Sequence, residues 1–358
     1  MKSNLFPRLS LKGSAYEIGH QHGSAFQSLI RDNIALYFDI FSYYAHLRRE
    51  EVIFRAPSFI PIIEEFDREI LEEIRGIADG SGCLLEEIIA LNARTEIMFK
   101  DGAPKHGECT ALAVTPEASA NGHTFIGQNW DWMIKVKKNV VILEIEQKEK
   151  PRILVFTEAG FVGKIGMNTA GLGLCANLLV GSDTVPGVPF HLFCRGILNA
   201  SSLGEALGKV LGHRSGASGN FLIAHADGEA IDIETNPIGN DYLYNNSGVI
   251  THTNHFESNL TVQDVGRTLF PDSILRYCRS GKLLNKERGR ITLQTLQNIL
   301  QDHFNHPNAI CRHVDNRLPE LEQIQTNASM VMDLTDRVMS VCTGNPCTEE
   351  YFPLTFGE

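Results

Sequence analysis

The sequence lacks any long apolar run. Nowhere do roughly 18 to 20 uninterrupted apolar residues follow one another, as a membrane-spanning helix requires. The polar start Met1-Lys2-Ser3-Asn4 also lacks the apolar core of a signal peptide. We therefore expect a soluble, cytoplasmic protein with no membrane partner.

Basic residues are also in short supply. The chain has 32 Lys and Arg against 43 Asp and Glu, which gives a net charge of −11. Proteins that bind nucleic acids usually collect Lys and Arg on one face, so we expect no nucleic-acid partner. In contrast, apolar residues make up 43% of the 358 residues, which is enough for a large core.

The eight cysteines form no CxxC pair and no repeat of the spacings found in zinc sites. We expect most of them to be buried free thiols of a reducing compartment, although Cys342 and Cys347 lie near enough in sequence to pair. A zinc site built from His252, His255 and a cysteine would lack an HExxH or CxxC frame. The sequence thus predicts no metal and no cofactor.

The first hundred residues have a helical pattern. Apolar residues recur there at spacings of three and four, which predicts helices over residues 26–44, 63–77 and 85–97. Gly76, Gly80 and Gly82 are expected to end the second of these helices. Residues 1–108 are therefore predicted to be a helical N-terminal segment.

From Cys109 onward the apolar period changes to two. This pattern predicts strands, and helical spacing returns between some of them. Strands, then helices, then strands again indicate an α+β protein with sheets stacked face to face and helices outside. The predicted strands are 109–114, 140–146, 153–156, 221–224, 230–234, 329–334 and 338–341, and the predicted helices are 189–211, 271–284 and 293–304.

Cys109 is the most informative residue. It opens the strand-like run 109–114 and follows a polar, breaker-rich stretch at residues 100–108. Cutting the bond between Glu108 and Cys109 would give Cys109 a free α-amino group, whose pKa of about 7.7 to 8.0 lies close to neutral pH. Cys109 would then supply both a nucleophile and its base.

Asp131 is the first candidate partner. It lies 131 − 109 = 22 residues after Cys109, which is enough for a strand, a turn at Asn121-Gly122 and a returning antiparallel strand. Its carboxylate would then lie near the start of the first strand, where it could hold a protonated amine. The alternative is that Asp131 only ends a strand.

Acyl transfer also needs hydrogen-bond donors aimed at the developing oxyanion. Asn254 and Asn177 each end a short apolar run, so either side-chain amide could serve, although asparagine at a strand end is also a common turn residue. Trp130 and Trp132 flank Asp131 and could form a wall of the substrate site, or simply belong to the core.

Several blocks of the chain together resemble a known family. In order and over nearly the whole chain, they are similar to the acyl-coenzyme A:6-aminopenicillanate acyltransferases, also called isopenicillin N acyltransferases. The blocks are Glu17-Ile18-Gly19, His22-Gly23-Ser24, Glu108-Cys109-Thr110, Gly127-Gln128-Asn129-Trp130-Asp131, Thr157-Glu158-Ala159-Gly160, Gly163-Lys164-Ile165-Gly166-Met167-Asn168, His252-Thr253-Asn254-His255 and Ile310-Cys311-Arg312.

The resemblance implies an N-terminal-nucleophile hydrolase with a four-layer α/β/β/α sandwich over residues 109–358. It implies that Cys109 cleaves the chain after Glu108 and then forms a thioester acyl-enzyme, and that segment 1–108 is released or retained as a partner. Asp131 would orient the amine and Asn254 would line the oxyanion hole. The further oxyanion or substrate candidates are Asn177, Gln128, Trp130 and His252.

The implied substrate is a small molecule with a linear amide or an acyl thioester. Water, an amine or coenzyme A could accept the acyl group. The chain has Glu108 where the fungal members carry glycine, and residues 325–327 read Gln-Thr-Asn where those enzymes carry a Ser-Arg pair. Without that arginine, binding of a penicillin carboxylate is not implied. The sequence leaves the oligomeric state open, a homo-oligomer included.

Two further interpretations stay open. In one, the chain remains intact and an internal cysteine pairs with His252 or His255, as in papain-like enzymes. In the other, the protein keeps the fold without being cut and acts as a non-catalytic binding protein.

Overall fold

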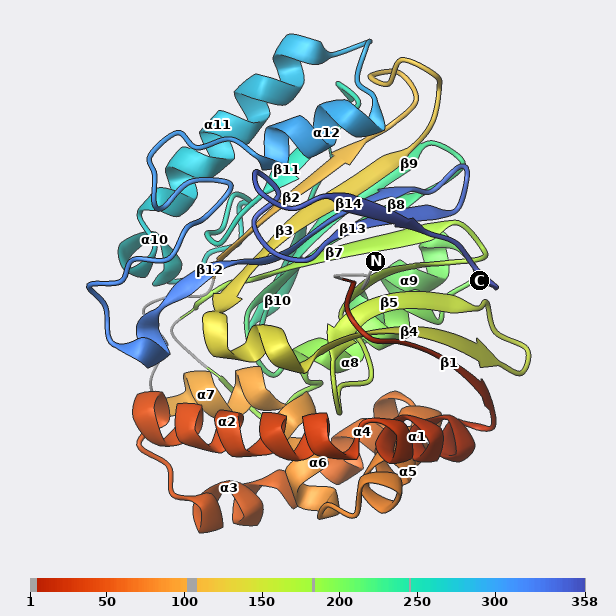
Figure 1. Ribbon diagram of the computed structural model, residues 1–358, viewed down its shortest axis with the longest axis vertical. Helices are drawn as coiled ribbons and strands as arrows, with labels where there is room; N and C mark the ends of the chain where they lie inside the picture. The colour runs from red at the N-terminus through yellow and green to blue at the C-terminus, as the bar shows by residue number, and fades with distance from the viewer. Residues whose placement is uncertain (1–4, 102–107, 182–183, 245, 358) are drawn as a thin grey trace.

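The computed structural model describes residues 5–101, 108–181, 184–244 and 246–357. Residues 102–107, the greater part of the breaker-rich stretch before Cys109, lie outside the described residues. Two β-sheets dominate the molecule, with helices at either side of the pair (Figure 1).

The larger sheet has eight strands in the order β1-β4-β5-β6-β7-β8-β9-β10. The first pair, β1 with β4, is parallel, and the remaining neighbours are antiparallel. Strands predicted at 140–146, 153–156, 221–224 and 230–234 are confirmed. The strands are β1 (Arg8–Gly13), β4 (Val140–Gln147), β5 (Ile153–Glu158), β6 (Ile165–Asn168), β7 (Leu172–Leu178), β8 (Gly219–His225), β9 (Glu229–Asn236) and β10 (Gly239–Leu243).

The smaller sheet has six antiparallel strands in the order β11-β2-β3-β12-β13-β14. It carries Cys109 on a central strand, and the strands predicted at 109–114, 329–334 and 338–341 are confirmed. Its strands are β2 (Glu108–Val114), β3 (Phe125–Met133), β11 (Val249–His252), β12 (Ile324–Asp333), β13 (Val338–Cys342) and β14 (Tyr351–Leu354).

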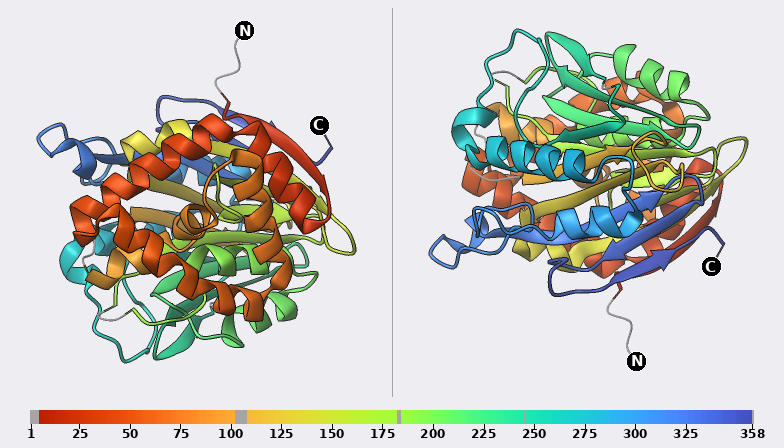
Figure 2. Two further views of the ribbon diagram at one scale, coloured as in Figure 1. Left: turned by 90° about the horizontal axis from the view of Figure 1, so that it is seen from below. Right: turned by 90° about the horizontal axis from the view of Figure 1, so that it is seen from above.

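Helices cover the outer face of each sheet. The helices α8 (Phe190–Leu198) and α9 (Leu203–Leu211) pack on the larger sheet, while α11 (Asp272–Glu287) and α12 (Leu293–Leu300) pack on the smaller one (Figure 2). Strands β2 and β3 face β7 across the space between the sheets. The predicted four-layer α/β/β/α sandwich is therefore confirmed. Across the described ranges, no helix combines the length and the apolar character needed to cross a membrane.

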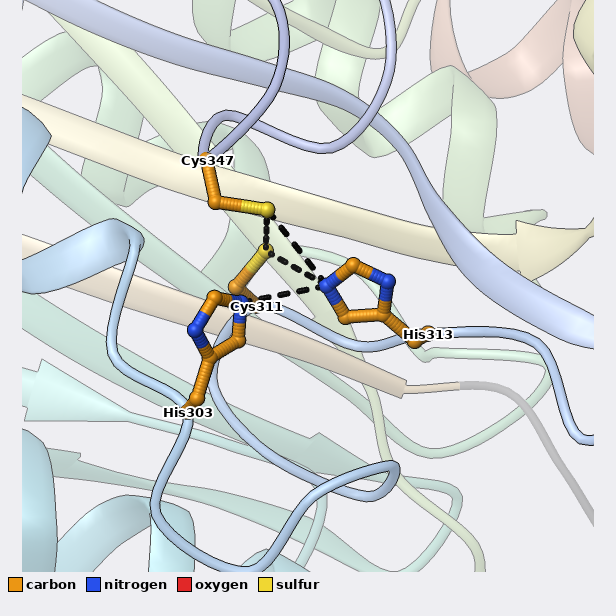
Figure 3. A group of neighbouring side chains, drawn as sticks. All are labelled: His303, Cys311, His313 and Cys347. Carbon is orange, nitrogen blue, oxygen red and sulfur yellow. Dashed lines mark hydrogen bonds between the residues drawn. The ribbon is translucent and has the colours of Figure 1, made fainter.

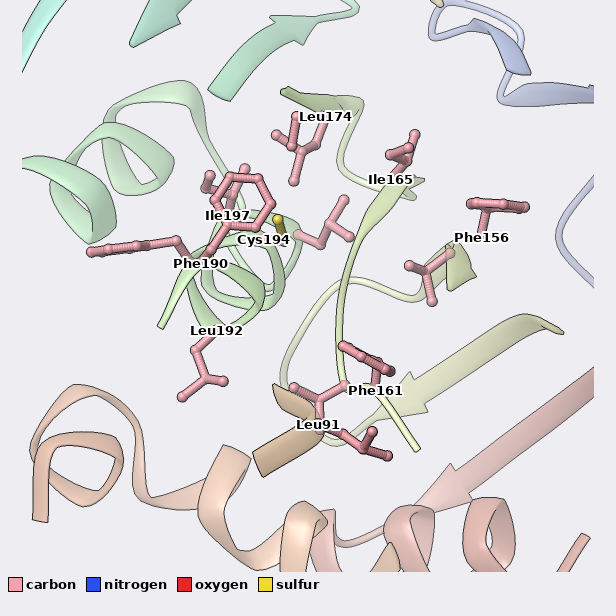
Figure 4. Packing of buried hydrophobic residues seen from close by; sticks show 14 of the residues in the cluster. Leu91, Phe156, Phe161, Ile165, Leu174, Phe190, Leu192, Cys194 and Ile197 are labelled. Carbon is pink, nitrogen blue, oxygen red and sulfur yellow. The ribbon is translucent and has the colours of Figure 1, made fainter. Parts of the chain in front are cut away.

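The core between α8 and the larger sheet joins the N-terminal segment to the rest of the chain. Every residue of α8 is buried, and its apolar side chains meet those of β6 and β7 (Figure 4). Leu91 from the N-terminal segment and Phe161 from the loop after β5 lie in the same cluster. Burial of apolar surface thus holds the N-terminal segment against the sandwich.

The N-terminal segment is mostly helical, as predicted, but not entirely so. It also contributes the edge strand β1, whose short alternation of polar residues with Leu9 and Leu11 was overlooked in the sequence. The second predicted helix is interrupted at Asp67, which has an extended backbone and caps the next helix by accepting from Glu69 N–H. The helices are α1 (Ala15–Ala25), α2 (Gln27–Ala45), α3 (Arg49–Arg55), α4 (Ile60–Phe66), α5 (Arg68–Ser81), α6 (Leu85–Asn92) and α7 (Arg94–Asp101).

Three glycines were expected to end the helix that contains α5, and for two of them the prediction is wrong. Only Gly82, with φ +64°, terminates α5. Gly76 and Gly80 lie inside the helix, opposite Gly19 and Gly23 of α1, and a Cβ on any of these four would come within 2.4 Å of the other helix's backbone. The glycines therefore serve close packing of α1 against α5.

Candidate active site

Cys109 lies at the second position of β2, opposite Trp130 of β3. Both side chains belong to the core between the two sheets, and Cys109 is only 6% exposed. Because successive residues of a strand point to opposite faces, Thr110, the residue after Cys109, faces the helical layer instead. The thiol is thus enclosed in the intact chain.

The backbone of Cys109 is held on both sides. Its N–H donates to Asn254 Oδ1 at 2.8 Å, and its carbonyl oxygen accepts from Arg276 Nη1 at 2.7 Å. This N–H belongs to the peptide bond that joins Glu108 to Cys109. Asn254, from the set predicted by sequence, therefore contacts the bond that was predicted to be cut.

The side chain of Asn254 has a defined orientation. Arg276 Nη2 donates to Asn254 Oδ1 at 3.1 Å, and a guanidinium can only donate, so the amide oxygen must face Cys109 N–H. Asn254 Nδ2 donates to the carbonyl oxygen of Leu178, at the end of β7, at 3.0 Å. In this arrangement Asn254 acts as an acceptor at the peptide bond. Its role as an oxyanion donor stays a prediction.

Asn177 lies next to that contact, one residue before Leu178 on β7. Its Nδ2 donates to the carbonyl oxygen of His252 at 3.4 Å, whereas its buried Oδ1 has no hydrogen-bond partner among the described residues. The structure therefore brings the two predicted asparagines to the same place, beside the end of β11. The oxyanion role of Asn177 also stays a prediction.

Asp131 lies directly opposite Glu108 in the β2–β3 pair, so it does return to the start of the first strand. Thr326 Oγ1 donates to Asp131 Oδ1 at 2.7 Å, and Arg312 Nε lies 4.0 Å from Oδ2. No hydrogen bond from a described residue reaches Oδ2. Burial raises the pKa of Asp131 to about 6, although the nearby Arg312 and Arg276 oppose this shift.

Arg276 was not predicted from the sequence. It is fully buried on α11, where its guanidinium also donates to Thr110 Oγ1, and its Nε donates to Asp272 Oδ2 at 3.1 Å. The buried residues of this helix include Ser273 and Ser280 at helical spacing from Arg276. This stripe of polar residues at helical spacing could have indicated that Arg276 is buried. A search for apolar periodicity does not detect it.

A second arginine joins the same polar group. Arg312 Nη2 donates to Asp272 Oδ2 at 2.5 Å, so Asp272 accepts from both Arg276 and Arg312. The two guanidiniums and the carboxylates of Asp131 and Asp272 form a buried charged network on the outer face of β2 and β3. Within this network each guanidinium lies beside at least one carboxylate, as burial of charge requires.

A different charged group lies on the inner face. Lys164 Nζ sits 3.5 Å from the ring centroid of Trp130 and 2.6 Å from Glu158 Oε1. Tyr37 OH, from the N-terminal segment, donates to Glu158 Oε2 at 2.7 Å. Burial lowers the pKa of Lys164 to about 8, although Glu158 opposes this shift. In the sequence, Lys164 belongs to one of the family-like blocks but had no predicted role.

These surroundings determine the state of the Cys109 thiol. Burial, followed by the charge of Asp131, raises the pKa of Cys109 to about 11. Hydrogen bonds from the Asp131 backbone and the Gln128 side chain, and the charge of Lys164, act in the opposite direction but do not cancel the effect. The thiol of the intact chain therefore carries its proton at neutral pH.

Gln128 connects the two sheets. Its Nε2 donates to the carbonyl oxygen of Ala176 on β7, and its Oε1 accepts from Ala176 N–H, both at 2.8 Å. This double hydrogen bond fixes the spacing between β3 and β7 beside the thiol. Trp130 packs edge-on against Phe156 of β5. Both candidates thus line the enclosed space around Cys109.

The two histidines of the alternative interpretations have different partners. His252 Nε2 lies 2.7 Å from Glu234 Oε1, and His255 Nε2 lies 2.6 Å from Glu257 Oε1. Burial alone would lower the pKa of His252, but the carboxylates of Asp232 and Glu234 raise it to about 9. Among the hydrogen bonds of the described residues, none joins either ring to Cys109. The geometry does not favour a cysteine–histidine pair.

Comparison with known proteins identifies the family. Residues 118–348 match the model of the acyl-coenzyme A:6-aminopenicillanic acid acyl-transferase family. The chain is also 30% identical, over 355 residues, to the acyl-coenzyme A:6-aminopenicillanic-acid-acyltransferase 40 kDa form of Emericella nidulans, covering 97% of this chain and 96% of the relative. The chain belongs to this family. The family resemblance and the expectation of an enzyme are thereby confirmed.

Solved structures with a similar chain course include a hydrolase and an acylase. This member of the acyl-transferase family aligns with a variant of conjugated bile acid hydrolase from Clostridium perfringens, at 17% identity and a TM-score of 0.49, over 70% of this chain and 97% of the hydrolase. It also aligns with penicillin V acylase from Agrobacterium tumefaciens, at 12% identity and a TM-score of 0.49, over 70% and 87% of the two chains.

Proposed function

We propose that this member of the acyl-transferase family is a self-processing amidohydrolase or acyltransferase with Cys109 as its N-terminal nucleophile. The observation that carries the proposal is the set of contacts around the Glu108–Cys109 peptide bond. Asn254 accepts from its N–H, Arg276 holds the next carbonyl, and Asp131 lies opposite Glu108. Three separate segments converge on one bond of the chain.

In the first step, the Cys109 sulfur attacks the carbonyl carbon of Glu108. The carbon–nitrogen bond breaks, a carbon–sulfur bond forms, and the nitrogen takes the thiol's proton to become an amine. Water then hydrolyses the thioester, which leaves a carboxylate on Glu108 and a free thiol on Cys109. Asn254 Oδ1 already accepts from this nitrogen, so the new amine stays in place.

In the second step, the mature enzyme acts on an external substrate. The α-amine of Cys109 takes the thiol's proton, and the thiolate attacks an amide or thioester carbonyl. Asp131, whose Oδ2 lacks a hydrogen bond from any described residue in the intact chain, stabilises the resulting ammonium. The amine or thiol leaves with a proton, and water or an amine releases the acyl group from Cys109.

The N-terminal segment is retained after cleavage under this proposal. Arg195 donates to both carboxylate oxygens of Glu73, at 2.8 and 2.6 Å, and both side chains are about 1% exposed. Arg94 Nε donates to His191 Nε2 at 3.1 Å, and β1 completes the edge of the larger sheet. Separating the fragments would break these contacts and expose the apolar surface that Leu91 and its neighbours bury, which is unfavourable.

The substrate class is a linear amide or an acyl thioester. The relative from Emericella nidulans is named for 6-aminopenicillanic acid, but the structure gives no reason to carry that acceptor over. The hydroxyl of Thr326, in the segment where a penicillin-binding arginine was missing from the sequence, is engaged by Asp131. We propose a small acyl donor with no required carboxylate clamp.

Mass spectrometry and N-terminal sequencing of the purified protein test the proposal. The wild type should give two fragments, the larger having 358 − 108 = 250 residues and beginning at Cys109. The Cys109→Ala variant should remain one chain and should not turn over amide substrates. The control is Cys278→Ser, because Cys278 is an exposed free thiol on α11.

Either of two results would overturn the proposal. An uncut wild-type chain that does not react with acyl probes would indicate a non-catalytic binding protein. Cleavage that persists in Cys109→Ala would place the nucleophile elsewhere. The Cys278→Ser control should be cut and active like the wild type.

A further inference from the structure

Four side chains outside the Cys109 site converge on one point. His303, Cys311, His313 and Cys347 each direct one nitrogen or sulfur atom inward, and these four atoms all lie within 4.8 Å of one another (Figure 3). Cys311 is buried, His313 and Cys347 are partly buried, and His303 is exposed. The sequence predicted no metal site, because the spacing of these four residues matches none of the usual zinc motifs.

The distances in this cluster fit a single tetrahedral ion. With zinc–sulfur bonds of about 2.3 Å and zinc–nitrogen bonds of about 2.0 to 2.1 Å, a tetrahedron separates its ligand atoms by roughly 3.4 to 3.8 Å. The Cys311 and Cys347 sulfurs are 3.6 Å apart, and they lie 3.7 and 3.4 Å from His313 Nε2. The two Nε2 atoms are 3.1 Å apart, slightly closer than a tetrahedron requires.

We propose that His303, Cys311, His313 and Cys347 bind one structural Zn²⁺ ion. Two thiolates and two imidazoles are a ligand set that zinc prefers, and a set of four protein ligands leaves no open position for substrate. Binding releases the two thiol protons to solvent, and the two thiolate charges then balance the charge of the ion. The site is therefore structural rather than catalytic.

The position of the cluster explains what the ion would stabilise. Three ligands come from the segment 301–319, which runs without a helix or strand between α12 and the short helix η3 (Glu320–Glu322). The fourth comes from the loop 343–350 between β13 and β14. Irregular segments of this length are uncommon inside a compact domain unless something orders them. A zinc ion would join the two loops to each other.

Hydrogen bonds around the cluster are those expected around a thiolate ligand. Asn345 Nδ2 lies 3.6 Å from Cys311 Sγ and donates to the carbonyl oxygen of Arg312 at 2.6 Å. Cys311 N–H donates to the carbonyl oxygen of Asp302 at 3.0 Å. Outer contacts of this kind hold metal ligands in the orientation that the ion needs.

Neither a disulfide nor an iron–sulfur cluster fits these four residues as well as zinc does. A disulfide needs sulfur atoms about 2.05 Å apart, whereas those of Cys311 and Cys347 are separated by 3.6 Å. A two-iron cluster with two histidine ligands holds its histidines and cysteines on different irons, which four atoms within 4.8 Å do not accommodate. His306 lies near His303 and His313 but supplies no atom to the group.

The site adjoins the network around Asp131 without being part of it. Arg312, between the ligands Cys311 and His313, donates to Asp272 and lies 4.0 Å from Asp131. A metal that fixes residues 311 and 313 would also fix the backbone of Arg312. The metal site itself does not depend on any chemistry at Cys109.

Metal analysis of the tag-free protein, purified without chelators, tests the site. We expect about one zinc per chain in the wild type, as for a structural four-ligand site, and less than about a tenth of that in Cys311→Ser and in Cys347→Ser. The matched controls are Cys278→Ser, an exposed cysteine, and His306→Gln, an exposed histidine beside the cluster. Both should keep their zinc.

Cobalt substitution supplies a second readout that does not require the cysteine variants to fold. Co²⁺ added to chelator-treated wild type should give the intense visible bands of a tetrahedral ion together with thiolate-to-cobalt charge transfer. Chelation should lower the melting temperature of the wild type, and added Zn²⁺ should restore it.

Several outcomes would overturn the site. These are a wild type without zinc that takes up neither Zn²⁺ nor Co²⁺, a native Cys311–Cys347 disulfide, another metal in the position, or zinc that persists in both cysteine variants. The uncut Cys109→Ala protein should also contain zinc. Failure of the proposed cleavage and failure of the metal site are therefore separate results.

Discussion

Cys109 and the pair Cys311–Cys347 show how partners decide what a thiol does. Cys109 is enclosed between two sheets, close to a carboxylate, a lysine and two side-chain amides, and no imidazole of a described residue bonds to it. Cys311 and Cys347 lie in the loops beside the smaller sheet, each within 3.7 Å of His313 Nε2. The first surroundings suit a nucleophile that must be uncovered, and the second suit a metal.

The difference between the two sites lies in what removes the proton. At Cys109, burial raises the pKa of the thiol to about 11, so the thiol of the intact chain is protonated, and in the proposed first step its proton passes to the nitrogen of the bond that breaks. Cleavage would supply an amine next to the sulfur and change this state. At Cys311 and Cys347, a divalent cation would remove the protons directly. Under the two proposals, the Cys109 thiol loses its proton to the amine that cleavage creates, and the Cys311 and Cys347 thiols lose theirs when a metal ion binds.

The largest effect is expected from Arg276→Lys. A lysine keeps the charge, but Arg276 reaches the Cys109 carbonyl, Asn254 Oδ1 and Asp272 from three different nitrogens, and the single nitrogen of a lysine does not reproduce this geometry. Since breaking a buried pair costs about 3 to 5 kcal/mol, we expect a loss of this order in the free energy of unfolding and at least about 100-fold slower self-cleavage. Urea denaturation and time-resolved gels measure the two effects.

The control for Arg276→Lys lies one turn further along α11. Arg279 pairs with Asp302, and its side chain is 32% exposed, so Arg279→Lys should change stability by less than about 1 kcal/mol. Equal losses in both variants would show that Arg276 supports only the helix. Zinc content should be unchanged in Arg276→Lys, which keeps the two cysteine sites separable.

A smaller effect concerns the pH dependence of stability. Burial raises the folded-state pKa of Asp131 to about 6, above the ordinary 3.8, so its stabilising contribution is fully present below pH 3.8 and is lost as the pH rises through 6. In the uncut Cys109→Ala background this amounts to about 3 kcal/mol. When Asp131→Asn is added to Cys109→Ala, the free energy of unfolding should no longer fall by this amount as the pH rises.

Comparison with the cut wild type sharpens the test of Asp131. In the cut protein, the new ammonium of Cys109 would favour the charged form of Asp131. The loss of unfolding free energy that Asp131 causes as the pH rises should therefore shrink or vanish. Denaturation of the uncut and cut proteins at about pH 5 and about pH 7.5, each with and without Asp131→Asn, measures about half of this decline, roughly 1.4 kcal/mol. Identical declines in the cut and uncut proteins would contradict contact between Asp131 and the amine.

The smallest expected effect is a difference between the cysteines in how readily an alkylating reagent labels them under native conditions. Exposed Cys278 should be labelled in every sample, and fully buried Cys194 in none. Cys109 should be labelled in the cut wild type. Cys311 and Cys347 should gain label only after chelation, because a bound metal protects thiolate ligands. Peptide mapping by mass spectrometry gives the result for each cysteine, and labelling of Cys347 before and after chelation alike would argue against the metal.

Much of the fold followed from periodicity in the sequence. Most strands are buried on both faces, one against the other sheet and one against helices, so they stand out in the sequence as short apolar runs rich in β-forming residues, and these runs located most of the strands. The edge strand β1 was missed because its alternation is short, with only Leu9 and Leu11 as apolar positions. Gly76 and Gly80 were misjudged because close contact with α1 requires glycine inside a helix, a tertiary demand that leaves no local signal.

Spacing alone predicted the site only where the chain returns locally, whereas Asn254 and Asn177 were proposed from their places at the ends of apolar runs and from the family resemblance. Asp131 follows from a hairpin, so its place opposite Glu108 could be worked out from spacing. Arg276 and Lys164 reach the neighbourhood of Cys109 from elements whose packing depends on the whole sandwich. The metal cluster was missed for a similar reason, because Cys347 lies 34 residues after His313 and joins it only in the folded chain.

Under the proposed self-cleavage, the contacts around the Glu108–Cys109 bond would make activation depend on synthesis of the chain at least as far as α11. The groups that hold Cys109 lie 145 and 167 residues further along the chain, in Asn254 and Arg276. A nascent chain that has not yet extruded α11 from the ribosome cannot assemble them, and neither can a truncated product. Chains that end before α11 would then keep an uncut Glu108–Cys109 bond and would not act on substrate.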